Sequence, residues 1–358
     1  MNVTVVGGGN VGTQLAVHCA NAGHRVTMYT SRSDKFSMNL TIVDREQKTI
    51  MTGSLSKATS DPEEAFKTAE LIIITFPTFC LRDISETLLP YTHKGLHIAI
   101  LPGAFGELFF KNHIEMGAVV FGLQRVPSVA RLVEYGKTVC ATGYRNELFA
   151  AAMPHDQTAE CCHLMEDIIG IKCSPIPCYL DLTLTPSNPI LHTTRLRTIF
   201  KDYVNGTVYD SLPLFYEDWT DESSKLLLSC DEEVQMICYH LPDLDLSYVR
   251  SLKEHYESSN AEQITAKISN IAGFRGLPTP CIKTNGKYKP DFESRYFKAD
   301  FAYGLEMIRQ FAALSNTNAP NINETIEWYY KVTSTAPVVD IGEFGIDSID
   351  SIYEFYSL

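Results

Sequence analysis

The sequence predicts a two-domain α/β protein, in which a doubly wound sheet is followed by an all-helical C-terminal domain. Two observations support this prediction. In the first half of the chain, short apolar segments alternate with amphipathic ones, as expected for parallel strands joined by helices. From Pro177 onward, strand signals fade and apolar residues recur at helical spacing. We therefore expect one domain over residues 1–176 and a second over residues 177–358.

The first element is an apolar strand that leads directly into a glycine-rich turn. Val3–Val6 precedes Gly7-Gly8-Gly9-Asn10-Val11-Gly12, which satisfies G-x-G-x-x-G and opens an amphipathic helix ending near Gly23. In a dinucleotide site the first glycine allows the tight turn, the second admits the pyrophosphate and the third lets the helix pack on the strand. The phosphates bind the free N–H groups at the helix start. The context favours a Rossmann nucleotide site over a plain turn, with these cofactor-binding residues: Gly7, Gly9, Asn10, Val11 and Gly12.

The end of the second strand indicates which nicotinamide cofactor binds. An NAD site usually has a carboxylate there, which accepts hydrogen bonds from the ribose. The predicted strand 25–30 is instead followed by Ser31 and Arg32. Hydroxyls and a guanidinium suit a 2′-phosphate, which a carboxylate would repel. We therefore expect Ser31 and Arg32 to favour NADP(H). NAD(H) is the alternative if the strand runs on to Asp34, which would then bind the ribose. A separate alternative is that Arg32 is an ordinary solvated surface residue.

The rest of the first domain alternates between strands and helices. Residues 71–76 are apolar on both faces, like a central parallel strand, and Pro77 follows in a loop expected to line the cofactor crevice. Asp61 and Pro62 form a typical helix start. Other strands are expected over 40–43, 49–51, 54–56, 96–101, 118–123 and 136–142, and other helices over 81–91, 105–116 and 157–169.

The second domain is expected to be helical. The periodicity predicts helices over 190–200, 224–240, 246–258, 260–272, 301–314 and 323–332. The tail over 340–358 is acidic with interleaved aromatic residues, which suits a docked helix or an extended arm.

Composition restricts the class of protein. The chain has 358 residues and a net charge of −13, and this acidity argues against nucleic-acid binding. No apolar run approaches the roughly 20 residues that span a bilayer, and a strand begins at once, so neither a membrane segment nor a signal peptide is expected. Without a signal peptide, the 10 cysteines are expected to be reduced in a cytoplasmic protein. They form no C-x-x-C pair, so no metal site is expected.

Two stretches of the second domain carry groups suited to catalysis. In the segment Asn188-Pro189-Ile190-Leu191-His192, the histidine lies near a helix start, where the helix dipole disfavours the imidazolium. Such a histidine can exchange protons near neutral pH. The second stretch, 295–305, contains Arg295 and Asp300. Spacing alone is equally consistent with a structural histidine, a helix-capping aspartate and a solvated arginine.

With the glycine motif, these stretches resemble the opine dehydrogenases of the octopine/nopaline type. That family joins a Rossmann domain to a helical domain of the 6-phosphogluconate dehydrogenase C-terminal type. Its Asn-Pro-x-x-His and Arg-Tyr-x-x-x-Asp-x-x-x-Gly-Leu segments correspond here to 188–192 and 295–305. The resemblance implies reductive condensation of an amino acid with a 2-oxo acid through an imine. It also implies that His192 is the acid/base, that Asp300 orients it, and that Arg295 and Asn188 bind substrate.

Two other interpretations remain open. One is a simple NADPH-dependent 2-oxo acid reductase like ketopantoate reductase, although no segment clearly matches the lysine and glutamate pair of such enzymes. The other is a non-catalytic NADP(H) sensor. A requirement for an amine separates the condensing enzyme from the reductase. The sequence identifies neither the amino acid nor the oxo acid, and it is compatible with a homodimer without requiring one.

Overall fold

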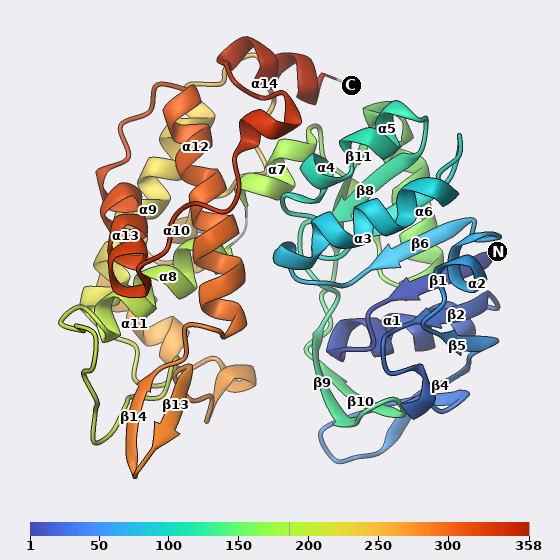
Figure 1. Cartoon of the computed structure of the whole chain (residues 1–358), viewed down its shortest axis with the longest axis horizontal. Coiled ribbons are helices and arrows are strands. Elements are labelled where there is room, and N and C mark those ends of the chain that lie inside the picture. Colours follow the sequence, from blue (N-terminus) through green and yellow to red (C-terminus); the bar gives the residue numbers. More distant parts are fainter. Residues whose placement is uncertain (186, 358) are drawn as a thin grey trace. The chain divides into compact units, whose positions relative to one another are not determined.

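The chain folds into two compact units (Figure 1). The computed structural model describes residues 1–185 and 187–357. The first unit is Met1–Thr183 together with the C-terminal residues from Tyr356 on, and the second is Leu184–Phe355. The boundary between the units thus falls a few residues after the predicted domain boundary at 176/177, and α7 (Tyr179–Leu184) lies across it.

The first unit is built on an eight-stranded sheet with the strand order β12-β11-β8-β7-β6-β1-β2-β5. The strand order reverses between β1 and β6, the switch point at which doubly wound sheets bind ligands. β11 runs antiparallel to β8, whereas the other neighbours are parallel. The strands are β1 (Asn2–Val6), β2 (Arg25–Tyr29), β5 (Lys57–Thr59), β6 (Leu71–Ile74), β7 (His97–Ile100), β8 (Val119–Leu123), β11 (Leu148–Met153) and β12 (Cys173–Pro175).

Helices cover this sheet, and the predicted ones are present with small shifts at their ends. Asp61 caps α2 as expected, because its side chain accepts a hydrogen bond from the Glu63 N–H at 2.9 Å. The predicted helix 105–116 is divided into two short ones. The helices are α1 (Asn10–Asn21), α2 (Pro62–Phe66), α3 (Leu81–Leu88), α4 (Gly106–Phe109), α5 (Lys111–Glu115) and α6 (Thr158–Ile169).

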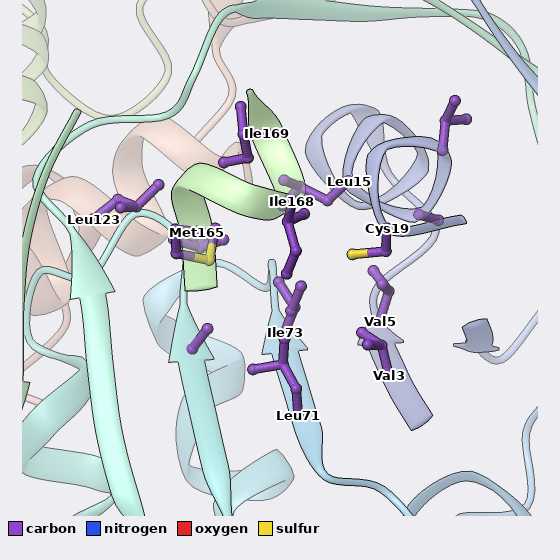
Figure 2. Packing of buried hydrophobic residues seen from close by; sticks show 14 of the residues in the cluster. Val3, Val5, Leu15, Cys19, Leu71, Ile73, Leu123, Met165, Ile168 and Ile169 are labelled. Atoms are coloured by element: carbon purple, nitrogen blue, oxygen red, sulfur yellow. The ribbon is translucent and has the colours of Figure 1, made fainter. Parts of the chain in front are cut away.

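The core of this unit lies between helices α1 and α6 and the sheet. Figure 2 shows apolar side chains of both helices packed over strands β1 and β6: Leu15, Cys19, Met165, Ile168 and Ile169 over Val3, Val5, Leu71 and Ile73. Several of the free cysteines are buried in this way. All four residues of β6 are buried, so both faces of this strand are covered, which explains why it is continuously apolar.

A second sheet packs against α1 and was not anticipated as a separate layer. Its order is β4-β3-β10-β9, with β3 (Asn39–Val43), β4 (Thr49–Ser54), β9 (Val129–Glu134) and β10 (Thr138–Thr142). A Cβ on Gly53 would lie 2.9 Å from the Val17 carbonyl oxygen, so β4 approaches the α1 backbone closely. The predicted strand 136–142 belongs to this sheet rather than to the main one.

The second unit is mainly helical, with a two-stranded hairpin of β13 (Cys281–Thr284) and β14 (Lys287–Pro290). The predicted helix 246–258 is wrong for most of its length. Only Leu252–His255 (α10) is helical, because Ser251 and Glu254 form a capping box that starts the helix there. The other helices are α8 (Ser187–Ile199), α9 (Asp221–Tyr239), α11 (Ala261–Ser269), α12 (Glu306–Leu314), α13 (Pro320–Thr333) and α14 (Ile349–Tyr356).

The segment between β14 and α12 is a π-helix, η6 (Tyr296–Leu305), where an α-helix was predicted from residue 301. Phe297 and Phe301 stack with ring centroids 5.5 Å apart, and Phe301 stacks on Tyr329 of α13 at 4.8 Å. These buried rings anchor η6 to the rest of the unit. π-Helical turns often occur at functional sites in proteins, so the residues of η6 are candidates for a functional role.

The end of α14 returns to the first unit. The Tyr356 hydroxyl donates to Glu107 Oε1 at 2.7 Å, and Thr183 donates to the same oxygen at 2.6 Å. Of the two alternatives expected for the acidic tail, a helix or an extended arm, the structure has the helix α14. Within the described residues, no helix is both long and apolar enough to cross a membrane, and no cluster of three metal-binding side chains occurs.

Candidate active site

His192 and Asp300 lie side by side in the second unit. His192 Nδ1 is 2.7 Å from Asp300 Oδ2, although the residues are 108 positions apart in sequence. His192 comes from α8 and Asp300 from η6. Their side chains are 3% and 12% exposed, so the contact is shielded from water. An ionised carboxylate can only accept, so Nδ1 carries the proton and Nε2 is left to exchange one.

Close packing of two motif residues fixes this pair. A Cβ on Gly304 would lie only 2.7 Å from Cγ of Pro189, so η6 and α8 touch where a side chain is missing. Pro189 lies three residues before His192, and Gly304 lies four residues after Asp300. The contact therefore sets the distance between the imidazole and the carboxylate.

A tyrosine hydroxyl contacts the other ring nitrogen of His192. Tyr216 Oη lies 2.7 Å from Nε2, and the Tyr296 ring packs edge-on against the imidazole with centroids 4.3 Å apart. Burial raises the pKa of Tyr216 well above the ordinary value of 10. Sequence reasoning missed Tyr216, because it lies in the irregular segment between α8 and α9, where no periodicity or motif marks it.

The two predicted substrate-binding residues form no hydrogen bond or ion pair with His192 or Asp300. Arg295 immediately precedes η6 and is exposed, and Asn188 is exposed in the first turn of α8. Neither side chain has a hydrogen bond or ion pair to the described part of the chain. Both are thus available to a ligand.

The glycine turn of the first unit has the geometry of a dinucleotide cradle. Gly7 has φ +105°, and a Cβ on Gly12 would lie 1.8 Å from the Gly7 carbonyl oxygen, so both positions require glycine. A Cβ on Gly9 would meet nothing within 4 Å, and α1 begins there without a side-chain cap. Open space and free N–H groups at one helix start fit a pyrophosphate.

The neighbours of these glycines have different surroundings. The Asn10 side chain accepts a hydrogen bond from the Leu132 N–H of β9 at 2.8 Å, so it ties the second sheet to the turn. Val11 is partly buried against the core. Pro77 is half-buried just after β6, where Thr75 donates to the Val6 carbonyl at 2.9 Å and joins the two strand ends.

The end of β2 carries no carboxylate. The strand ends at Tyr29, and Asp34 lies beyond it in a short 3₁₀ turn (Ser33–Lys35). Ser31 and Arg32 are exposed, and the Arg32 guanidinium lies over the Tyr135 ring, 5.6 Å from its centroid. The strand does not run on to Asp34, and only a longer strand was expected to bring that residue to the ribose.

Comparison with known proteins extends over both units. Residues 175–333 match the family model for the α-helical domain of NAD/NADP octopine/nopaline dehydrogenase. Residues 2–105 match the model for the N-terminus of NAD-dependent glycerol-3-phosphate dehydrogenase. The chain is 26% identical to tauropine dehydrogenase of Arabella iricolor, over 98% of this chain and 99% of the relative. It is 22% identical to octopine dehydrogenase of Pecten maximus, over 95% and 92%.

Solved structures with the same fold include octopine dehydrogenase with NADH and L-arginine. That structure has a TM-score of 0.84 at 21% identity and covers 98% of this chain and 97% of its own. Octopine dehydrogenase with NADH and pyruvate has a TM-score of 0.83 at 20% identity, over 99% and 98%. NADP⁺-bound yersinopine dehydrogenase has a TM-score of 0.63 at 9% identity, over 100% and 98%.

Proposed function

Because this chain belongs to the opine dehydrogenase family of the octopine/nopaline type, we propose that it joins an amino acid to a 2-oxo acid by reductive condensation. It is a nicotinamide-dependent oxidoreductase acting on CH–NH groups. The amine and the carbonyl form an imine with loss of water, and reduction of the same carbon gives an N-(carboxyalkyl)amino acid. The observation that carries this proposal is the buried contact of 2.7 Å between His192 and Asp300.

His192 provides the proton that the condensation requires. Loss of water from the first adduct needs a proton on the departing oxygen, and His192 holds one at Nε2 when it is charged. Asp300 keeps the other proton on Nδ1 and stabilises the imidazolium. The dinucleotide, held by Gly9 and the start of α1, supplies the hydride when bound.

Arg295 is proposed to hold the carboxylate of the 2-oxo acid. Its guanidinium is exposed and has no partner within the described residues, and a two-pronged hydrogen bond to a carboxylate suits its planar donors. Asn188 is proposed to assist at the same substrate. Arg295→Ala is expected to raise the KM for the oxo acid with little effect on dinucleotide affinity.

NADP(H) is the proposed cofactor. Ser31 and Arg32 are exposed directly after β2, and together they offer hydroxyl and guanidinium donors to a 2′-phosphate. The relatives include structures with NADH and with NADP⁺, so the preference of this chain depends on these side chains.

The test is oxidation of NADPH or NADH with a matrix of amino acids and 2-oxo acids, followed by mass detection of the product. We expect turnover that depends on both substrates. His192→Asn should lower kcat about 100-fold or more at unchanged NADPH affinity. His163→Asn makes the same change at an exposed position of α6 and serves as the control. Turnover without an amine would indicate a simple reductase, and cofactor binding without any turnover would indicate a sensor.

A further inference from the structure

We propose that Tyr216 is the residue through which His192 exchanges its proton with the substrate. This inference rests on the proposed function. Both ring nitrogens of His192 already have partners, because Asp300 and Tyr216 each lie 2.7 Å from one of them. A substrate oxygen can therefore reach the imidazole proton in two ways. Either it displaces the tyrosine, or it receives the proton through the tyrosine hydroxyl.

The hydrogen bonds form a chain with a defined direction. With His192 neutral, Tyr216 donates to Nε2 and Nδ1–H donates to Asp300. When Nε2 is protonated, it donates to the Tyr216 oxygen, and the phenolic O–H turns outward. The Tyr216 side chain also hydrogen-bonds to Tyr296, whose ring lies against His192. The hydroxyl thus has a second hydrogen-bonding position besides the one toward His192, and in the proposed transfer the substrate oxygen takes this position in exchange for Tyr296.

The Tyr216 ring is held in a way that opposes displacement. It stacks on Phe274 with centroids 4.3 Å apart and lies edge-on to Phe215 at 4.9 Å. Tyr216 itself is 5% exposed. Moving the ring out would expose this aromatic surface to water, which is unfavourable.

Arg195 fixes the backbone on both sides of Tyr216. Its Nε donates to the Phe215 carbonyl at 2.9 Å and its Nη2 to the Asp218 carbonyl at 2.6 Å. Arg195 lies one turn after His192 on α8, and it is 2% exposed. Helix α8 therefore carries the imidazole of His192 and, through Arg195, also holds the loop that places the Tyr216 hydroxyl against this imidazole. This arrangement favours transfer through Tyr216 over its displacement.

The step is balanced without a free tyrosinate. As the departing oxygen of the adduct takes the phenolic proton, the phenolic oxygen takes the proton from Nε2. The C–O bond breaks, its electron pair leaves with the water, and the nitrogen lone pair forms the C=N bond. Burial raises the pKa of Tyr216, which disfavours the anion, so we expect the two transfers to occur together.

The test compares the wild type with Tyr216→Phe in single-turnover reactions with saturating NADPH, amine and oxo acid. We expect the rate to fall about 100-fold with KM values changed less than about threefold. The rate in mixtures of H₂O and D₂O should curve for the wild type, with two protons in transfer, and this curvature should be lost in the variant. Tyr239→Phe, at a tyrosine that is 74% exposed, is the control.

Other outcomes would overturn the inference. An unchanged rate, or a lowered KM at unchanged rate, would mean that substrate displaces the tyrosine. If Tyr216→Phe does not fold, 3-fluorotyrosine at position 216 keeps the ring and hydroxyl but changes the phenol acidity, and an unaltered rate and solvent isotope effect would reject the relay. Wild-type protein without turnover would remove the proposed function and the relay together. Wild-type turnover with an unaffected variant would remove the relay alone.

Discussion

Gly304 and Pro189 meet at the crossing of η6 and α8, where a Cβ would lie 2.7 Å from the proline Cγ. The proline ring cannot rotate away, so any side chain at 304 must push the two helices apart. We expect Gly304→Ala to lower the free energy of unfolding by about 1–3 kcal/mol, and Gly304→Val by more. Because the crossing sets the His192–Asp300 distance, kcat should fall in the same order. Chemical denaturation and steady-state rates measure both, with Ala313→Val at an exposed position of α12 as the control. Equal stability of all the variants would contradict this account.

Gly9 and Gly12 should respond to alanine in opposite ways. A Cβ at position 9 has open space, and the backbone there (φ −86°) suits alanine, whereas a Cβ at position 12 would lie 1.8 Å from a carbonyl oxygen. Gly9→Ala should keep its stability and lose dinucleotide affinity, because the methyl group projects into the space assigned to the pyrophosphate. Gly12→Ala should lose stability. Thermal unfolding and fluorescence titration with NADPH distinguish the two variants. If Gly9→Ala keeps its full affinity for NADPH, the phosphates bind elsewhere.

Arg32 should decide between the two nicotinamide cofactors. Arg32→Ala removes the guanidinium at the end of β2, so the Kd for NADPH should rise about 10- to 100-fold. This change corresponds to the free energy of one hydrogen bond to a charged group. The Kd for NADH should change little. Arg25→Ala removes an exposed arginine from the other end of the same strand and is the matched control. An equal loss of affinity for NADPH and NADH would show that Arg32 does not recognise the 2′-phosphate.

Glu107 should make the first unit less stable as the pH rises. Burial raises the pKa of its carboxyl from 4.5 to about 7, and Oε2 has no hydrogen-bond partner within the described residues. The native state then keeps a proton that the unfolded state releases. The contribution of this group to the free energy of unfolding is fully present below about pH 4.5. It is lost as the pH rises to 7, and the loss is about 3 kcal/mol at most.

Glu107→Gln tests this pH dependence. The amide still accepts from Thr183 and Tyr356 but cannot ionise. The melting temperature of the variant should fall less than that of the wild type between pH 5 and 8. Glu86→Gln, at an exposed position of α3, should follow the wild type. Parallel pH profiles of Glu107→Gln and wild type would show that the carboxyl is already ionised in the native protein.

Local patterns in the sequence were sufficient for much of the fold. The glycine turn and the cap at Asp61 were predictable because each depends on a few neighbouring residues. The second sheet was not, because its parallel pairing of β3 with β10 joins segments almost 100 residues apart. The π-helical turn of η6 was also missed, since its apolar residues fit an ordinary helix equally well.

The candidate site was predictable in part for the same reason. His192 and Asp300 stand in motifs, and the family resemblance predicts that they act as a pair. Tyr216 and Arg195 have no such mark. Tyr216 lies in the loop between α8 and α9, and hydrogen bonds from the Arg195 guanidinium set the path of that loop. No local sequence pattern reveals such tertiary bonds.

The bond from Tyr356 to Glu107 has a consequence for biosynthesis. The first unit contains residues from both ends of the chain, so it lacks one of its buried hydroxyl donors until the ribosome has made position 356. Nascent chains stalled before that point should therefore expose the Glu107 region to proteases, and release of the last helix should close it.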